Sequence, residues 1–239
     1  MVAFKTFRRF NDPALRPLAG VRARIDGRAP EYFGSESLPD KLVCALGRRK
    51  ALPIKEIFES FEFFARVRRR LRAPHVADLC CGHGLTGALF AVFEGDTVER
   101  VTLLDKRRPD NHDQVLEALK EVAPWAVGRL EFVQAPVSRA GSILSQGASV
   151  VGVHACGART DRCLDVALEK GGAVAVMPCC YFKTTPAAPR AVRSALGAEI
   201  ATDVHRTYRL EAAGYTVQWS AIPEEISSMN RIIVGVKGR

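Results

Sequence analysis

The sequence predicts an α/β fold with a seven-stranded sheet, in which five parallel strands are followed by an antiparallel C-terminal hairpin. Short apolar runs alternate with helical stretches from residue 75 onward, which is typical of a parallel sheet flanked by helices. A glycine-rich turn joins the first of these runs to the first of these helices. Only eight residues, PEEISSMN, separate the last two runs, and a parallel crossover needs more.

The elements follow from hydrophobic periodicity. Seven runs rich in apolar or β-branched residues are expected to form strands: 75–81, 101–105, 130–134, 149–156, 173–180, 215–222 and 231–237. Helices are expected between them at 85–94, 112–122, 138–145, 160–170 and 187–213. Upstream, apolar residues recur at spacings of three and four over 53–72, which predicts an amphipathic helix that presents its arginines to solvent.

Residues 1–52 are expected to form a basic N-terminal extension, followed by one domain over 53–239. The extension has weak periodicity and scattered Pro and Gly, with one short helix expected near 40–47. The whole net charge of +9 lies within residues 1–73, and RVRRRLR (66–72) is its densest run. A positive surface attracts polyanions such as RNA, although a solvated face that keeps a protein soluble is the alternative.

Composition excludes several classes of protein. With 47% hydrophobic and 26% charged residues in 239, the chain is neither disordered nor collagen-like. No stretch approaches 18 apolar residues, so we predict no membrane span. The basic start MVAFKTFRRF lacks the apolar run of a secretory signal, which predicts a cytoplasmic location. The seven cysteines, two pairs of which are adjacent, are then expected to be reduced thiols.

A nucleotide-type cofactor site is expected at the glycine turn. Gly82, Gly84 and Gly87 match G-x-G-x-x-G between a strand and a helix, where missing Cβ atoms and free N–H groups let a ligand approach closely. Asp105 ends the second strand, where an acid can accept both hydroxyls of a ribose; a helix N-cap is the alternative. Lys106 and the two arginines after it would instead favour a cofactor with a 2′-phosphate on its ribose, as in NADP.

The segment from Asp78 to Gly84, DLCCGHG, resembles the glycine motif of class I S-adenosylmethionine-dependent methyltransferases, with Cys80 in place of the first glycine. The resemblance implies a Rossmann-like methyltransferase sheet and S-adenosyl-L-methionine as cofactor. It also implies that Asp78 holds the methionine amino end through the loop, while Gly82 and Gly84 line the cofactor and Asp105 binds its ribose. The remaining predicted cofactor contacts are Cys80, His83, Lys106, Gln134, Ala135 and His154.

Two further motifs follow the fourth and fifth strands, HACG (154–157) and PCCY (178–181). Together they resemble a narrower methyltransferase subgroup, which includes ribosomal-RNA-adenine-dimethylase-like domains and is related to a tRNA 2′-O-methyltransferase family. That resemblance covers roughly 53–239 and does not fix the acceptor, because the subgroup's substrates are diverse and include RNA. RNA is the leading acceptor predicted here, with a protein acceptor left open. His154 is the candidate general base and Tyr181 the candidate acceptor-orienting residue. A core histidine and a tyrosine that caps its strand are the alternatives.

The cysteines of these motifs allow three interpretations: a metal site, a catalytic thiolate, or small residues at crowded strand ends. We assign no metal ligand, because adjacent residues on a strand point to opposite faces and no C-x₂-C pair exists. Lys183, Arg190 and Arg193, after the fifth strand, either contact a polyanionic acceptor or form a solvated helix face.

The predicted activity is therefore methyl transfer from S-adenosylmethionine, with RNA binding through the basic N-terminal region. One alternative is an NAD(P)-dependent oxidoreductase on a similar fold, against which the C-terminal hairpin and the lack of a Tyr-x-x-x-Lys pair argue. The other is a non-catalytic RNA-binding module with a degenerate cofactor site.

Overall fold

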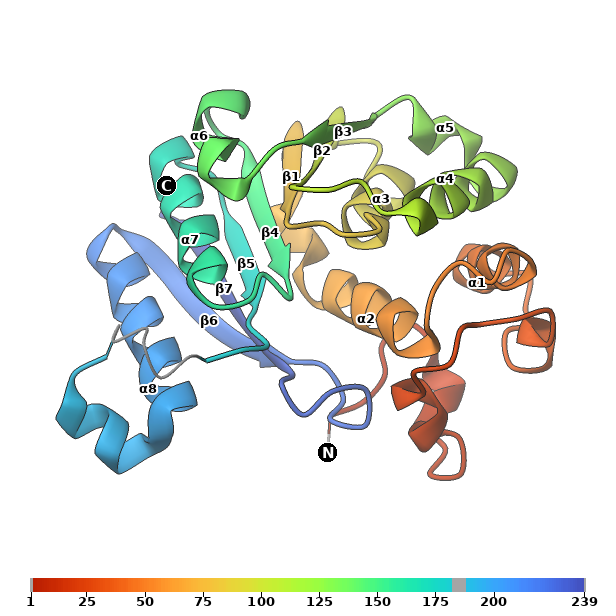
Figure 1. Ribbon diagram of the computed structural model, residues 1–239, viewed down its shortest axis with the longest axis horizontal. Coiled ribbons are helices and arrows are strands. Elements are labelled where there is room, and N and C mark those ends of the chain that lie inside the picture. Colours follow the sequence, from red (N-terminus) through yellow and green to blue (C-terminus); the bar gives the residue numbers. More distant parts are fainter. Residues whose placement is uncertain (1, 182–187, 239) are drawn as a thin grey trace.

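The computed structural model describes residues 2–181 and 188–238. Its centre is a seven-stranded sheet in the order β3-β2-β1-β4-β5-β7-β6 (Figure 1). The strands are β1 (His75–Leu79), β2 (Arg100–Asp105), β3 (Leu130–Gln134), β4 (Ser149–Val153), β5 (Val174–Met177), β6 (Tyr215–Ala221) and β7 (Arg231–Lys237). The first five pair in parallel, and β7 runs antiparallel to both β5 and β6. The predicted sheet and its C-terminal hairpin are confirmed.

Helices cover both faces of the sheet. They are α1 (Leu38–Arg48), α2 (Ile54–Leu71), α3 (Leu85–Phe93), α4 (Asp110–Val122), α5 (Pro124–Val127), α6 (Ala140–Ile143), α7 (Ala158–Lys170) and α8 (Arg190–Ala212). The sequence analysis missed the short α5, and α8 contains a break at Gly197, which has φ 79°. The helix expected over 187–213 begins only at Arg190, and Lys183 and residue 187 lie outside the described residues. Within residues 2–181 and 188–238, no helix combines the length and apolar character that crossing a membrane requires.

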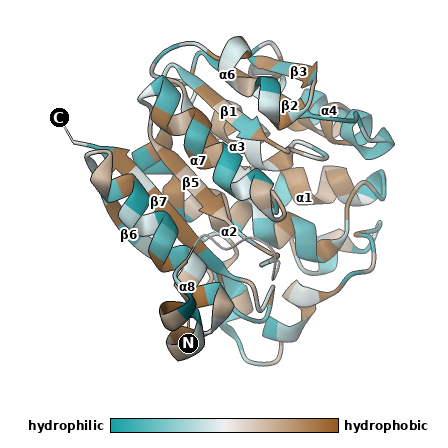
Figure 2. Cartoon of the chain, turned by 60° about the vertical axis from the view of Figure 1, so that its left-hand side comes forward, coloured by the Kyte–Doolittle hydropathy of each residue, from teal (hydrophilic) through white to brown (hydrophobic). Residues whose placement is uncertain are grey.

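Side chains alternate between two core layers. Val76, Leu103 and Val151 face the layer that includes α2 and α3, whereas Ala77 and Leu104 face the layer that includes α7. Every residue of β1 is buried, as expected for a central parallel strand covered on both faces. Figure 2 shows the hydrophobic colour concentrated on the strands and the hydrophilic colour on the outer turns of α4 and α7.

The fourth and fifth strands end earlier than predicted. The sequence analysis extended them to residues 156 and 180, but β4 ends at Val153 and β5 at Met177. His154 has φ 57°, a left-handed conformation that ends a strand, and Pro178 has no N–H for a sheet ladder. The HACG and PCCY motifs therefore form the loops that follow the two strands.

The N-terminal region packs onto α2, beside which it lies in Figure 1. It contains α1, which confirms the helix expected near 40–47, and three 3-10 helices, η1 (Arg8–Asn11), η2 (Arg16–Gly20) and η3 (Ala29–Glu31). The rings of Phe4, Phe7, Phe10 and Phe33 surround that of Phe58 in α2, with centroids 4.7 to 6.0 Å from it. All five rings are buried, so this segment shares the core of the domain.

The prediction that α2 presents its arginines to solvent is wrong for Arg66, whereas Arg69 and Arg70 are exposed as predicted. The side chain of Arg66 is 2% exposed and pairs with the fully buried Glu62. Arg68 and Arg72 both pair with Glu94 at the end of α3. Two buried carboxylates, those of Glu62 and Glu94, therefore offset part of the positive charge in 66–72.

Candidate active site

The glycine turn between β1 and α3 is built on left-handed backbone. Cys80, Gly82 and Gly84 have φ of 59°, 52° and 80°, so Cys80 adopts the conformation that suits the glycine of the resembled motif. A Cβ on Gly87 would lie 2.5 Å from Leu103 and 2.8 Å from Asp78, so glycine lets α3 pack closely on the sheet.

A cavity of about 460 Å³ opens in front of this turn. A Cβ on Gly82 would meet no atom within 4 Å, which shows that the turn leaves open space for a ligand. The cavity is lined by Arg22, Pro53, Lys55, Glu56, Glu59, Ser60, Asp78, Cys80, Cys81, Gly82, His83, Thr86, Val153 and His154. The turn and cavity thus suit the predicted cofactor, and five of its predicted contacts line the cavity: Asp78, Cys80, Gly82, His83 and His154.

Two aspartates hold the glycine turn in place. Asp78 Oδ2 accepts a hydrogen bond from the Gly87 N–H at 2.8 Å, and Asp105 Oδ2 accepts one from the Gly82 N–H at 3.0 Å. Asp105 Oδ1 also accepts from the Arg107 N–H at 3.2 Å. Asp105 lies beside Gln134 in the β2–β3 register, and the Ala135 N–H donates to the Asp105 carbonyl. Asp105, Gln134 and Ala135 thus gather at one sheet edge, joined by Lys106, which follows Asp105 in the chain.

Burial raises the pKa of Asp78 from 3.8 to about 7. Between these two values the folded protein keeps a proton that the unfolded chain releases, so its stability falls as pH rises through this window. We expect the Asp78→Asn variant to lack this decline, whose steepest slope is about 1.4 kcal/mol per pH unit. Urea denaturation at several pH values measures it, with the exposed Asp96→Asn as the control. Parallel pH profiles for wild type and Asp78→Asn would contradict the prediction.

A carboxylate–histidine pair crosses the cavity. Glu59, from the N-terminal half of α2, is 2% exposed, and its Oε2 lies 2.9 Å from His154 Nε2. Lys55 Nζ donates to the other Glu59 oxygen. Burial alone would raise the pKa of Glu59, but the close approach and charge of His154, helped by Lys55, lower it overall. Glu59 is therefore a buried carboxylate held against His154.

A second pair lies beside the first. His83 Nε2 is 3.5 Å from Glu56 Oε2, and burial lowers the pKa of His83 to about 4. His83 is thus neutral at physiological pH, and its Nδ1 accepts from the Leu85 N–H at 3.1 Å. This bond satisfies a free N–H in the first turn of α3.

The sequence analysis missed the cavity residues contributed by α2. The signal in the sequence was Glu59 itself, one of two acids in the largely apolar stretch IFESFEFF (57–64) of the predicted helix. Acids are almost never fully buried without a partner, so such a position suggests a functional or paired carboxylate. The partner, His154, is 95 residues away in the sequence, and only the fold brings the two together.

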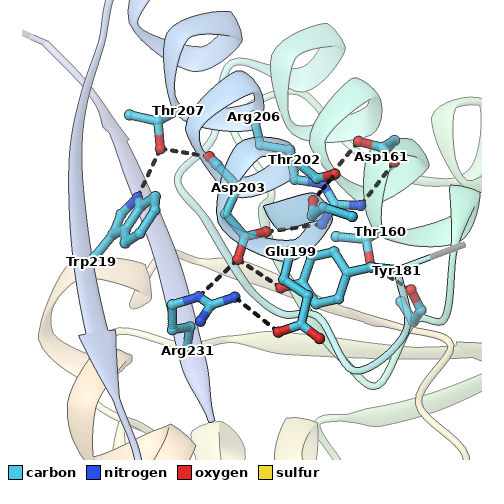
Figure 3. Close-up of polar contacts among 12 residues, drawn as sticks. Thr160, Asp161, Tyr181, Glu199, Thr202, Asp203, Arg206, Thr207, Trp219 and Arg231 are labelled. Atoms are coloured by element: carbon cyan, nitrogen blue, oxygen red, sulfur yellow. Dashed lines mark hydrogen bonds and ion pairs between the residues drawn. The ribbon is translucent and has the colours of Figure 1, made fainter. Parts of the chain in front are cut away.

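Tyr181 belongs to a buried polar network rather than to the cavity lining (Figure 3). Its hydroxyl donates to Asp203 Oδ2 at 2.6 Å, and burial raises its pKa. Asp203, on α8, also accepts from Arg206 and from Arg231 of β7, and Arg206 in turn holds Asp161 of α7. The network fixes the loop after β5 to three elements, and a contact between Tyr181 and an acceptor stays a prediction.

Three thiols also converge at this edge of the sheet. Among residues 2–181 and 188–238, the one group of His, Cys, Asp or Glu atoms close enough to share a metal ion is Cys156, Cys179 and Cys180.

Comparison with known proteins places the chain in a family. No curated protein sequence matches it. Several solved structures are similar. A precorrin-6y C5,15-methyltransferase from Geobacter metallireducens has 15% identity and a TM-score of 0.48, covering 74% of this chain and 88% of its own. The SAH-bound methyltransferase PaMTH1 of Podospora anserina has 14% identity and a TM-score of 0.48, covering 86% and 89%.

A family model described as a methyltransferase domain matches residues 49–186, more than half of the chain. This match favours methyl transfer over the nicotinamide-dependent alternative, and S-adenosylmethionine is the cofactor of such a domain. On its sequence, the chain belongs to this methyltransferase domain family.

Proposed function

We propose that the protein transfers the methyl group of S-adenosylmethionine to RNA. The observation that carries this proposal is the Glu59–His154 pair, which lines the same cavity as the glycine turn. When bound, the cofactor supplies an electrophilic methyl group, and the protein has to align the acceptor and remove its proton. In this proposal residues 53–239 form the methyltransferase domain of a cytoplasmic protein, and residues 1–52 are its basic N-terminal region.

The glycine turn would hold the cofactor. Gly82 leaves space beside its backbone, and Asp78 and Asp105 keep the turn in shape through the N–H groups of Gly87 and Gly82. Asp105 is also the residue proposed to bind the ribose, with Gln134 and Ala135 beside it toward the adenine. The Asp105 carboxylate already accepts a hydrogen bond from the turn, so it is held in position before the cofactor binds. This lowers the entropic cost of binding the cofactor.

His154 would act as the general base. Its Nε2 faces Glu59, so Nδ1 is the ring nitrogen left to take a proton from an acceptor hydroxyl or amine. The Glu59 carboxylate, 2.9 Å from Nε2, would hold the ring in position and offset the positive charge that develops on it during proton transfer. The left-handed backbone at His154 is costly for a non-glycine residue, and such conformations cluster at active sites.

RNA is proposed as the acceptor because basic side chains share the cavity with this pair. Arg22 and Lys55 both line it, and Arg22 comes from the N-terminal region that carries the net positive charge. The phosphate groups of RNA bind to basic side chains of this kind. The HACG and PCCY loops resemble those of a subgroup whose substrates include RNA, which is compatible with this acceptor.

Incubation with labelled methyl donor and a cell extract separated into RNA and protein tests the acceptor. We expect label in RNA, and a loss of about tenfold in RNA labelling for Arg22→Ala with unchanged affinity for S-adenosylhomocysteine by calorimetry. Arg28→Ala is the matched control, since Arg28 is exposed, pairs with Asp26 and does not line the cavity. Label only in protein would overturn the RNA acceptor. Tight NADP binding without S-adenosylhomocysteine binding would overturn methyl transfer.

A further inference from the structure

The loops after β4 and β5 bring three thiols into mutual contact. Cys156 Sγ lies 2.9 Å from Cys179 Sγ and 3.6 Å from Cys180 Sγ, and the latter two sulfurs are 3.6 Å apart. Cys156 comes from the HACG loop, and Cys179 and Cys180 come from the PCCY loop. The three sulfur atoms therefore form a triangle between neighbouring strand ends.

This arrangement removes one of the two reasons for assigning no metal ligand from the sequence, that adjacent strand residues point to opposite faces. That reasoning placed Cys179 and Cys180 on a strand, where neighbouring side chains point to opposite faces. Because β5 ends at Met177, both residues lie in a loop, and their sulfurs turn to the same side. The backbone around Cys156 is equally unusual, with left-handed φ at His154 (57°) and Gly157 (63°).

Simpler roles for these cysteines explain less. A small core residue would be buried, as Cys163 is, yet all three thiols are half-buried. A disulfide would use two of the sulfurs and leave the convergence of the third without a cause, and the adjacent Cys179 and Cys180 bridge each other only with strain. Three accessible sulfurs within contact distance are what a thiophilic metal ion requires.

We propose that Cys156, Cys179 and Cys180 bind a zinc ion through three thiolates, with a fourth position open to water or an added ligand. Zn–S bonds of about 2.3 Å in tetrahedral geometry place sulfurs about 3.8 Å apart, close to the two separations of 3.6 Å. The sulfur atoms of Cys156 and Cys179, which lie 2.9 Å apart, need to move slightly away from each other. Each thiol releases its proton to solvent on binding.

A bound ion would cross-link the ends of β4 and β5. His154 lies two residues before Cys156, and its N–H donates to the Met177 carbonyl at the end of β5. The ion would thus hold the loop that carries the proposed base. The site stands apart from the proposed function, because it requires neither the cofactor nor an acceptor.

Titration of the reduced full-length protein with Co²⁺, followed by displacement with Zn²⁺, tests the site. We expect one ion per chain, a thiolate-to-cobalt charge-transfer band and release of protons. Cys156→Ser, Cys179→Ser and Cys180→Ser should each weaken binding at least about 100-fold, whereas Cys44→Ser, a half-buried thiol of α1, should leave it unchanged.

Alkylation followed by mass spectrometry provides a measurement that needs no variant. Zinc should slow the labelling of Cys156, Cys179 and Cys180 and leave that of Cys44 unaffected. Absence of the charge-transfer band, or binding that survives Cys180→Ser, would overturn the proposal. So would a Cys156–Cys179 disulfide that forms equally well with and without zinc.

Discussion

Replacing Glu62 with alanine is expected to lower the free energy of unfolding by about 3–5 kcal/mol. The Glu62 side chain is fully buried and pairs with Arg66, whose guanidinium is 2% exposed. Its two oxygens also accept from the backbone N–H groups of Lys5 and Thr6 at 2.9 to 3.0 Å. The variant therefore leaves the Arg66 guanidinium and two backbone N–H groups without the carboxylate that they contact. Each buried group that loses its partner carries a desolvation cost.

Urea denaturation of the full chain measures this loss. The matched control is Glu36→Ala, because Glu36 is 93% exposed where it pairs with Lys41, and solvent screens such a pair so that it contributes little to stability. Hydrogen exchange gives a second, local measurement. Because Glu62 binds the chain at Lys5 and Thr6, protection of the amides at 4–10 should fall in the Glu62→Ala variant. A loss below about 1 kcal/mol with unchanged protection would show that this contact does not anchor the N-terminal segment.

Replacing His154 with alanine is expected to lower kcat by about 100- to 10,000-fold, the range for loss of a general base. Affinity for S-adenosylhomocysteine should change much less, because the glycine turn and its two aspartates do not depend on the imidazole. Glu59→Gln should lower kcat by a smaller factor, since it keeps the shape of the side chain but removes the charge that offsets the positive charge developing on the ring.

Single-turnover kinetics with saturating methyl donor separate this role from a structural one. The pH dependence of the rate should differ between His154→Ala and wild type, because the variant lacks the ring that accepts the proton. His205→Ala is the control, because His205 lies on α8 and does not line the cavity. If His154→Ala and wild type share the same pH profile and the same kcat, His154 is not the base.

The order of the elements was predictable because it depends on local pattern. The alternation of apolar runs and helical stretches yielded five parallel strands, and the short link between 222 and 231 yielded the hairpin that the structure confirms. The glycine turn was likewise recognisable, since a backbone of positive φ needs glycine at defined spacings. Strand ends were less predictable, because His154 and Pro178 ended runs that remain apolar in sequence.

The sequence by itself determined the sheet, the hairpin, the glycine turn and the class of enzyme domain, because each depends on residues close together in the chain. The tertiary structure alone decided which distant side chains meet. It joined Glu59 to His154, gathered the three thiols and buried the arginine of a basic run that had suggested an RNA-binding face. These contacts depend on the order in which the strands lie side by side in the sheet and on the residue at which each strand ends. Hydrophobic periodicity along the chain carries no information about either.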